Sequence, residues 1–517
     1  MKVLLVNPLS GYQVGSMPLG VGYLAAYLET QGHQVVFQDR VPTFYRNNRD
    51  LALVDRETRV AAEALRPDWI GITMTTAQVY DTYHVARLLR RVPGASHAAI
   101  VLGGYHPTTE PELTLRECAE ADIAVRGEGE FTFADLAAGL AHSSVPGITY
   151  RNEGQILSTP DRPLHDKLDD FLPPPRRLYD AGFYYRRKAD VLSGWYVKAA
   201  TLMTSRGCPK RCKFCAAEVI LPRVRFHSVD YVLAELEGIL RHYDVEVISF
   251  IDIMFISRWS RTDELCRRLI AEKLNRRLRW GASITADSIT KDKLALMKAA
   301  GCRYLNFGFE TGSQRMLDLM NKRVKVEKNH NAARWAEELG LMCNSAFLMG
   351  LPGETEADLE LTAQFLQRYN IFSTGINIMA PLPGSTYYRE FMDTGVLTYT
   401  PELWQIIGAV FHDNSTRDDI PVFSDIPRDR LFQLVDRIND EIINPMNARN
   451  YLRANWRRDP RGALRHATYL LSRSPWIRNA ATRRIARALR ALRRGPTPPP
   501  PAPIPARGYH PNDSGIA

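Results

Sequence analysis

Apolar and amphipathic segments alternate along the first 145 residues. Short apolar runs of strand length follow one another, separated by segments with helical periodicity. The predicted strands are residues 2–7, 33–39, 69–75, 98–104 and 122–127. Such alternation predicts a parallel sheet covered by helices on both faces, a doubly wound, Rossmann-like α/β domain. Ligands of these sheets bind at the carboxyl ends of the strands.

A second alternating series begins at Tyr196 and ends near residue 400. Its predicted strands are residues 198–205, 246–252, 278–284, 303–309, 342–350 and 375–381. Six strand–helix units predict a partial (β/α)6 barrel of the TIM type, with its chemistry at the carboxyl ends of the strands. Residues 146–195 contain proline clusters and are predicted to be a linker between the two domains.

The remainder divides into a helical region, residues 401–494, and a proline-rich tail, residues 495–517, that is predicted to be disordered. Residues 449–494 hold fourteen arginines and a single acid, Asp459. An amphipathic basic helix is predicted at 477–494. It either packs on the barrel or makes peripheral contact with an anionic membrane surface. No nucleic-acid recognition fold accompanies the charge, so nucleic acid is not an expected partner.

Composition indicates a cytoplasmic protein. No apolar run approaches the roughly 18 residues of a membrane span, and the N-terminal residues predict a strand, not a signal peptide. The seven cysteines are odd in number and partly clustered, which argues against a disulfide framework and favours a reducing compartment.

Three of these cysteines, Cys208, Cys212 and Cys215, fall just after the first strand of the second series. Thiolates are soft ligands suited to zinc or to iron–sulfur clusters. A four-iron cluster usually takes four cysteines, so three in one loop would leave one iron open to a substrate. The alternative is a zinc site completed by a distant residue, although the paired CxxC arrangement typical of such sites is missing.

The segment CPKRCKFC resembles the CxxxCxxC signature of radical S-adenosylmethionine (SAM) enzymes, including the aromatic Phe214 before the last cysteine. The resemblance implies a [4Fe-4S] cluster held by the three cysteines, with SAM chelated to the fourth iron. It also implies reductive cleavage of SAM to a 5′-deoxyadenosyl radical, and an external electron donor such as flavodoxin or ferredoxin.

Further segments resemble the same family. Glu310, in FGFETGSQ, matches the acid that hydrogen-bonds the ribose hydroxyls of SAM, and Gly350, in FLMGLPGET, matches the segment along the adenine. Ser283 on the third strand is a candidate contact of the methionine moiety. The alternatives are a surface acid at a strand end and a packed serine. Asp252 is either an acid of the site or a helix cap.

The first domain resembles the cobalamin-binding domain fused to many radical SAM enzymes, through PLGVGYLAAYLETQGHQVVFQD, IVLGGYHPT and RGEGEFTF. The resemblance implies that the nucleotide tail of the corrin passes the glycine pair, where missing side chains allow close approach. The alternative is a set of tight turns without a ligand, and His106 is expected to be a turn residue. The candidate cobalamin-binding residues are Thr73, Thr75, Gly103, Gly104, Gly127 and Glu128.

Together the two cofactors imply C-methylation of an unactivated carbon in a small-molecule or lipid-like metabolite. The alternative is a radical cyclisation or rearrangement of the tetrapyrrole or hopanoid type. A cobalamin-binding regulator without chemistry is a third hypothesis, which the intact cysteine set and Glu310 disfavour. No acid–base catalytic residue is predicted, because hydrogen-atom abstraction by a radical needs none.

Overall fold

The computed structural model describes residues 1–10, 17–189, 196–400, 402–409, 421–457 and 460–472. The first domain contains a seven-stranded sheet of order β2-β1-β3-β4-β5-β6-β7. Its strands are β1 (Lys2–Asn7), β2 (Gln34–Asp39), β3 (Trp69–Thr73), β4 (Ala99–Gly103), β5 (Ile123–Val125), β6 (Ile148–Asn152) and β7 (Gln155–Ser158). β1 to β5 are parallel, as predicted for a doubly wound domain.

The last two strands form an antiparallel hairpin at the sheet edge. The sheet therefore continues to Ser158, past the predicted boundary at residue 145 and into the range assigned to the linker. The hairpin ends in the proline cluster at 159–163, and the backbone N–H of Gly147 donates to the Pro160 carbonyl at 2.7 Å.

Alternation within β1 gives the sheet two apolar faces. Val3 and Leu5 pack in one core with helices of one face, whereas Leu4 and Val6 pack in a second core on the other. Both faces are thus buried, as parallel sheets require. The helices are α1 (Leu19–Thr30), α2 (Arg40–Arg46), α3 (Leu51–Leu65), α4 (Val79–Arg90), α5 (Tyr105–Thr109), α6 (Pro111–Glu117) and α7 (Gly129–Ala137).

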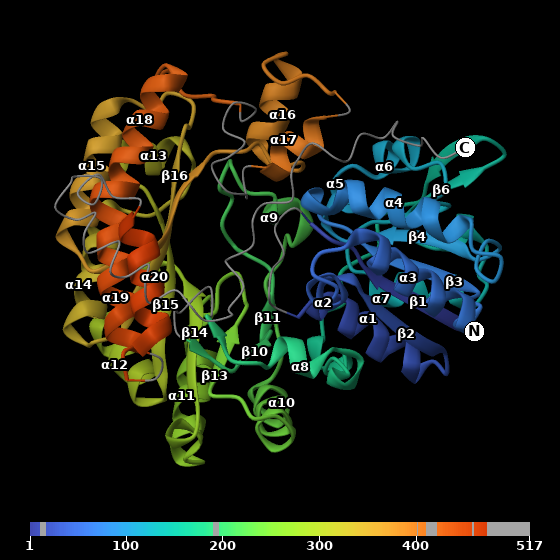
Figure 1. The fold of residues 1–517 in the computed structure, drawn as a ribbon, viewed down its shortest axis with the longest axis horizontal. Coiled ribbons are helices and arrows are strands. Elements are labelled where there is room, and N and C mark those ends of the chain that lie inside the picture. The colour runs from blue at the N-terminus through green and yellow to red at the C-terminus, as the bar shows by residue number, and fades with distance from the viewer. Residues whose placement is uncertain (11–16, 190–195, 401, 410–420, 458–459, 473–517) are drawn as a thin grey trace.

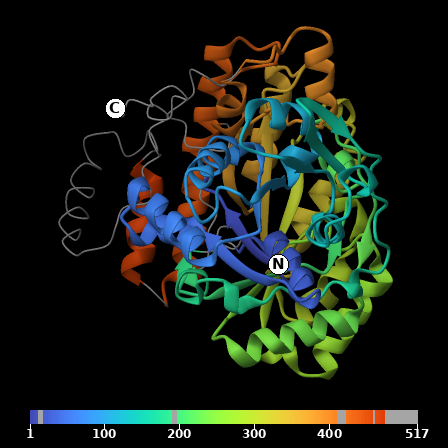
Figure 2. The ribbon, with the colours of Figure 1, turned by 90° about the vertical axis from the view of Figure 1, so that its right-hand side faces the viewer.

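The second sheet has six parallel strands in sequence order, which confirms the predicted partial barrel. They are β10 (Ala199–Leu202), β13 (Val247–Phe250), β14 (Arg279–Ile284), β15 (Cys302–Glu310), β16 (Met342–Met349) and β17 (Ile371–Ile378). The connecting helices are α10 (Val229–His242), α11 (Trp259–Ala271), α12 (Lys291–Ala299), α13 (Gln314–Leu319), α14 (Val326–Glu338) and α15 (Glu356–Arg368). Figure 1 shows the first domain beside the barrel, and Figure 2 shows it in front of the barrel strands.

Short elements join the two domains. They are α8 (Ala181–Tyr184), β8 (Lys188–Ala189), β9 (Tyr196–Val197), β11 (Ser205–Arg206), α9 (Ala217–Ile220) and β12 (Arg225–Phe226). The pair β11–β12 is antiparallel and lies just before and after the predicted cysteine motif. The motif is therefore enclosed in a hairpin-like excursion between the barrel and the first domain (Figure 1).

The C-terminal region is helical, as predicted, within its described residues. Its helices are α16 (Thr386–Asp393), α17 (Leu403–Ala409), α18 (Arg428–Ile438), α19 (Asn444–Asn455) and α20 (Pro460–Ser472). α17 ties the region to the first domain, because Trp404 donates to Glu117 at 3.0 Å. The predicted basic helix at 477–494 and the tail at 495–517 lie outside the described residues.

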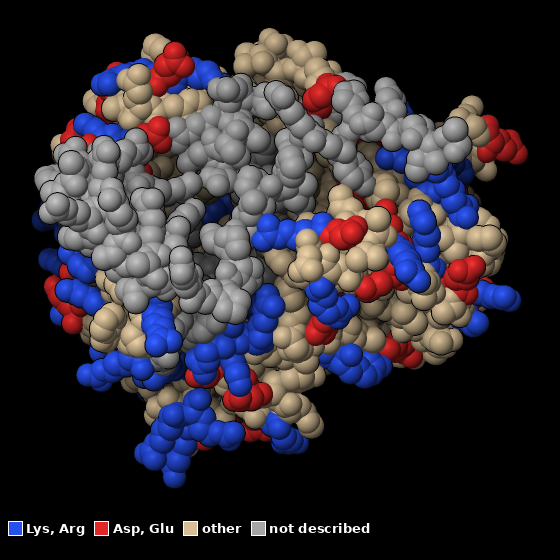
Figure 3. All heavy atoms as spheres, viewed as in Figure 1, with Lys and Arg blue, Asp and Glu red and all other residues tan. Residues whose placement is uncertain are grey.

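None of the described helices combines the length and apolarity needed to cross a membrane. On the face seen in Figure 3, basic and acidic side chains are interspersed over the described parts of both domains. The surface charge visible there is therefore mixed, as expected for a chain whose excess of arginine lies near the C-terminus.

Candidate active site

The cysteine loop, residues 207–216, runs from β11 to α9 at the carboxyl end of β10. It begins at Gly207, whose φ is +111° and where a Cβ would lie 2.2 Å from the Arg223 carbonyl oxygen. Only glycine fits this turn. Cys212 is buried, whereas Cys208 and Cys215 are partly exposed.

Neighbouring elements hold this loop from two sides. The Lys213 N–H donates to the Met320 carbonyl at 3.0 Å, and the Lys213 carbonyl accepts from the Tyr387 N–H at 3.0 Å. The Asn321 side chain donates to the Arg211 carbonyl at 2.7 Å. The turn after α13 therefore fixes the path of the cysteine loop. A loop held in this way keeps its ligands preorganised.

The three thiols lie close to one another. Burial raises the pKa of Cys212 to about 11, and the charges of Cys208 and Cys215 act on it in the same direction. Among the described residues, no three or more His, Cys, Asp or Glu side chains converge on a point where they would hold a single metal ion. The three thiols are therefore not placed as a closed site for a single metal ion in this structure. Their chemistry, three thiols within eight residues of one loop, fits a cluster with one open iron.

Lys322 is a residue of this site that the sequence did not reveal. Its Nζ lies 2.6 Å from Glu310 Oε1, and only 8% and 13% of the two side chains are exposed. The ammonium also lies 5.8 Å from the centre of the Phe214 ring. Although burial alone would lower it, Glu310 and the nearby thiol of Cys212 keep the pKa of Lys322 above its ordinary value. A buried cation therefore stands between the predicted ribose ligand and the cysteine loop.

The backbone around this ion pair is strained. Glu310 has a φ of +63°, and Asn321 and Arg323, on either side of Lys322, both have a φ of +54°. Non-glycine residues in the left-handed region cost free energy and cluster at ligand sites. The side chain of Glu310 folds inward over Gly308, where a Cβ would lie 2.8 Å from both Glu310 Oε1 and Lys322 Nζ. The missing side chain at Gly308 thus makes room for the pair.

Two other predicted residues also lie on the barrel strands. Gly350 follows β16 with a φ of +81°, and its N–H donates to Glu354 Oε2 at 2.6 Å. Burial raises the pKa of Glu354 to about 8. Ser283 lies on β14 and accepts from the Asn306 amide at 3.3 Å, so the two strands share a polar layer.

Asp252 does not cap the helix that follows it, since α11 begins after Arg258. It is buried, and its carboxylate accepts from the Thr204 N–H at 3.1 Å, from the Thr204 hydroxyl at 2.8 Å and from the Ser205 hydroxyl. These contacts fix the chain just before the cysteine loop. Asp252 therefore supports the loop from the neighbouring strand.

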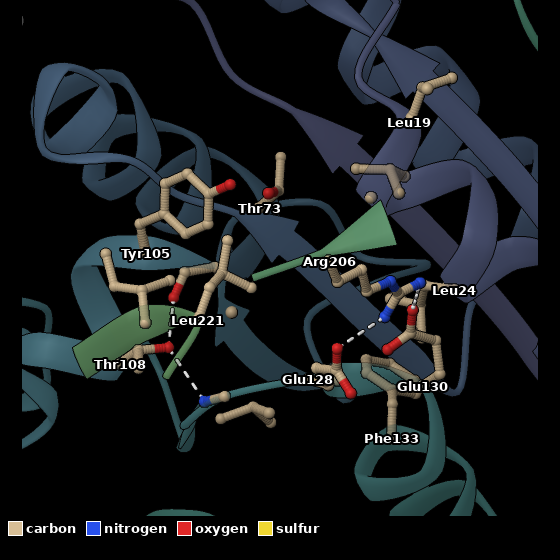
Figure 4. A pocket seen from close by; sticks show the side chains of 18 of the residues that line it. Leu19, Leu24, Thr73, Tyr105, Thr108, Glu128, Glu130, Phe133, Arg206 and Leu221 are labelled. Atoms are coloured by element: carbon tan, nitrogen blue, oxygen red, sulfur yellow. Dashed lines mark hydrogen bonds and ion pairs between the residues drawn. The ribbon is translucent and has the colours of Figure 1, made fainter. Parts of the chain in front are cut away.

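A cavity separates the carboxyl edge of the first sheet from the carboxyl end of the barrel (Figure 4). Five of the six predicted cobalamin residues line it, namely Thr73, Gly103, Gly104, Gly127 and Glu128. Thr75 does not line it. Its backbone and hydroxyl bind the Gln78 side chain at 3.0 Å, so Thr75 caps the short helix that follows β3.

Apolar side chains from the barrel side face the same cavity. Ile251 and Ile253, which follow β13, are 38% and 43% exposed, and Tyr105 of the first domain is 51% exposed. Large apolar side chains that remain exposed between two domains indicate a surface that a ligand covers. A broad apolar mouth over a glycine-rich edge fits a flat macrocycle such as a corrin.

The two walls of the cavity are joined by buried ion pairs. Arg206, directly before Gly207, contacts Glu128 at 3.0 Å and Glu130 at 2.8 Å, and Arg225 contacts Glu128 at 2.6 Å. Although burial alone would raise it, these arginines hold the pKa of Glu128 below its ordinary value. Glu128 thus binds the barrel domain, and Figure 4 shows its carboxylate turned toward Arg206.

Comparison with known proteins agrees with this architecture. The family model of the radical SAM superfamily matches residues 202–366, and that of the B12 binding domain matches residues 14–137. A Pyrococcus horikoshii protein named as an uncharacterized methyltransferase is 32% identical over 408 residues, covering 77% of this chain and 84% of that protein. The anaerobic magnesium-protoporphyrin IX monomethyl ester cyclase of Rubrivivax gelatinosus is 27% identical over 411 residues, covering 76% and 70%.

Solved structures share the fold. The radical SAM methyltransferase TsrM of Kitasatospora setae, with cobalamin and a [4Fe-4S] cluster bound, superposes with a TM-score of 0.62 at 20% identity, covering 77% of this chain and 76% of TsrM. The cobalamin-dependent radical enzyme OxsB gives a TM-score of 0.60 at 22% identity, covering 84% of this chain and 61% of OxsB. With both family models matched in this order and a 32% identical relative covered over 84% of its length, the chain belongs to the radical SAM superfamily and carries a B12 binding domain ahead of its radical SAM domain.

Proposed function

We propose that this radical SAM enzyme is a cobalamin-dependent C-methyltransferase that acts on an unactivated carbon of a small-molecule or lipid-like substrate. One observation carries the proposal. A single cavity is lined both by the glycine-rich edge of the B12 binding domain and by Ser205, Arg206 and Gly207, which lead directly into the cysteine loop. A methyl donor and a radical generator must reach the same substrate carbon, and a shared cavity permits this.

The residues around the cysteine loop have distinct roles in this proposal. Cys208, Cys212 and Cys215 would hold a [4Fe-4S] cluster, which supplies the electron that cleaves SAM. Glu310 would accept hydrogen bonds from the ribose diol, because a carboxylate accepts from both hydroxyls. Lys322 would pair with the methionine carboxylate of SAM, which needs a cation in this buried place.

Three more residues would border SAM. Gly350 would lie along the adenine, Ser283 would offer a hydroxyl to the methionine moiety, and Phe214 lies beside Lys322. No acid or base is assigned, because abstraction of a hydrogen atom moves no separate proton. The chain's own contribution is to bind, to orient and to exclude water from the radical.

On the other wall, the nucleotide tail of cobalamin would be bordered by Thr73, Gly103, Gly104 and Gly127. Bound cobalamin would supply the methyl group. The cavity extends from this edge between the sheet and helices α1 and α7, past Leu24 and Phe133. A slot of that shape suits an extended tail, and Glu128 would keep the slot aligned with the barrel through Arg206. Thr75 is left out of this set because it caps a helix.

Relatives give the proposal its reaction class. Besides the Pyrococcus protein, the cytidylyl-2-hydroxyethylphosphonate methyltransferase of Streptomyces wedmorensis is 24% identical over 455 residues. The 27% identity to the Rubrivivax cyclase supports the second candidate, a radical cyclisation on a tetrapyrrole-like substrate. An external flavodoxin or ferredoxin is the proposed electron donor, and the cytoplasm is the proposed location.

The test is anaerobic reconstitution with iron, sulfide and hydroxocobalamin, followed by incubation with reduced flavodoxin, methyl-labelled SAM and a small-molecule extract. Methylation predicts S-adenosylhomocysteine and 5′-deoxyadenosine together, with label in a small molecule. Deoxyadenosine without S-adenosylhomocysteine would favour the cyclase. Zinc in the loop, or cobalamin that does not bind, would overturn both candidates.

A further inference from the structure

Tyr105 is the largest side chain that the carboxyl ends of β3 and β4 present to the cavity. The other described lining residues at or directly after these two strand ends are Thr73, Gly103, Gly104 and Thr108. Half of the Tyr105 side chain is exposed, and the space it faces is the cavity between the domains (Figure 4). Its phenol hydroxyl makes no hydrogen bond to any described residue.

The position of Tyr105 is fixed by the backbone below it. Gly104 has a φ of +111°, and a Cβ there would lie 2.8 Å from the Met74 carbonyl oxygen, so this sharp turn requires glycine. The Thr108 hydroxyl donates to the Gly104 carbonyl at 2.7 Å and accepts from the Gly127 N–H at 3.0 Å. The start of α5 is therefore rigid, and the ring it carries points into open space.

The histidine beside Tyr105 faces elsewhere. His106 is fully buried, its Nδ1 lies 3.2 Å from the Thr76 hydroxyl, and its ring packs against Trp404 with centroids 4.6 Å apart. It does not line the cavity, and no histidine is among the described residues that do. The edge of the sheet therefore offers a phenol to a ligand in the cavity, and no imidazole.

We infer that Tyr105 faces the cobalt of bound cobalamin from the B12-domain side and occupies the lower axial side of the corrin. The inference rests on the proposed cobalamin site. With the nucleotide tail in the slot between the sheet and helices α1 and α7, the corrin must lie across the carboxyl edge. The side chain that projects from that edge then meets its lower face.

The chemistry of Tyr105 suits this place. The ordinary pKa of a phenol is about 10, so the group is neutral at physiological pH. A neutral phenol is a weak donor to a metal, whereas an imidazole is a strong one. The identity of an axial ligand tunes the electronic state of a metal in a macrocycle. Tyr105 would therefore shield cobalt from water while leaving its lower side weakly ligated.

The substitution Tyr105→His tests the inference by placing an imidazole where the phenol stands. The reconstituted enzyme is loaded with cobalamin, reduced to the cob(II)alamin form and measured by electron paramagnetic resonance. We expect wild type to lack nitrogen splitting on the cobalt lines and Tyr105→His to gain it. We also expect Tyr105→Phe, which lacks the oxygen, to shift the cobalt hyperfine pattern without adding nitrogen splitting.

The control is Tyr27→His, on α1 with its ring against Phe131, which should give the wild-type spectrum. Cobalamin bound per chain is measured for every variant, so failure of the cobalamin site itself is seen in wild type and is distinct from failure of the inference. A Tyr105→His protein that binds a full equivalent of cobalamin with an unchanged spectrum overturns the role of Tyr105. Nitrogen splitting in wild type, or equally in Tyr27→His, overturns it as well.

Discussion

The two walls of the interdomain cavity are built in opposite ways. On the barrel side, the cysteine loop is bracketed by hydrogen bonds to Met320, Asn321 and Tyr387, with the Glu310–Lys322 ion pair beside it. On the other side, the edge of the first sheet presents glycines and threonines, and its carboxylate Glu128 is turned to Arg206 and Arg225. The barrel side is therefore defined by its thiols and its ion pair, whereas the B12 side is defined largely by glycines, which leave space.

This difference follows from what each wall would bind. A cluster and a sulfonium need thiolates, charge and fixed geometry. An unpaired charge inside a protein is strongly destabilising. A macrocycle with a long tail needs space and shape, and most of its contacts are apolar. Single substitutions on the barrel wall should therefore cause large losses of cluster or SAM binding. Those on the B12 wall should weaken cobalamin binding in proportion to the volume they add.

Loss of a thiol should have the largest effect. Cys212→Ala removes one of three ligands, and we expect cluster iron to be lost and deoxyadenosine formation to fall by at least about 1,000-fold. Iron content and product mass spectrometry measure this. The matched control is Cys118→Ala, a free buried cysteine of the first domain, which should keep both. A Cys212→Ala protein with normal turnover would show that the loop is dispensable, and would contradict the difference drawn between the two walls.

Removal of the buried cation should come next. Lys322→Met would leave the methionine carboxylate of bound SAM without its counter-charge in a buried place, where losing one partner of a pair costs about 3 kcal/mol or more. We expect SAM affinity to drop roughly 100-fold at that cost, with Lys322→Arg retaining part of it. Equilibrium binding of SAM to the reconstituted protein measures the change. Lys213→Met is the control, because its ammonium is partly exposed and its pair with Glu390 contributes little.

Added volume on the B12 wall should have a graded effect. Gly103 has no left-handed φ, and a Cβ there would meet only Val125, at 3.9 Å. We therefore expect Gly103→Ala to bind cobalamin almost normally and Gly103→Val to bind it roughly tenfold more weakly, by about 1.4 kcal/mol. Spectrophotometric titration with hydroxocobalamin measures both. Equal affinity in Gly103→Val would mean that the tail passes elsewhere.

The same contrast explains what the sequence could predict. The strands, the partial barrel and the cysteine loop were predictable, because buried strands require apolar runs and a cluster requires thiolates at fixed spacing. Lys322 was not, because it stands 12 residues after Glu310 and meets it only through a left-handed turn. Nothing in MNKRV marks one lysine as buried. Flanking left-handed residues are a property of the folded backbone.

The B12 wall was predicted through its glycines, and there the limits were different. Thr75 resembled a tail contact, but the local capping geometry with Gln78 decides its place. Glu128 was expected at the cofactor, and its partners Arg206 and Arg225 come from another domain. The strands β6 and β7 were missed because prolines nearby indicated a linker. Only the place of Glu128 was decided by contacts distant in sequence, whereas Thr75 was decided by a local cap and the hairpin was hidden by neighbouring prolines.

The smallest expected effect on turnover comes from Glu354 on the barrel wall, whose titration changes the stability of the chain with pH. Glu354 has a pKa of about 8 in the folded chain, raised by burial, against about 4.5 when exposed. Between these values the folded state holds a proton that the unfolded state has released. The free energy of unfolding must therefore fall as pH rises from about 5 to about 8.

Glu354→Gln keeps an acceptor for the Gly350 N–H without titrating, so its thermal midpoint should change less across this range than that of wild type. Between pH 5 and pH 8 we expect the unfolding free energy of wild type to fall by roughly 3 kcal/mol more than that of Glu354→Gln. Glu356→Gln is the control: that exposed carboxylate pairs with Arg430, which holds its pKa below the ordinary value, so it titrates below this window. Parallel pH profiles for wild type and Glu354→Gln would show that Glu354 is ionised in the folded chain, and that the hydrogen bond from Gly350 outweighs its burial.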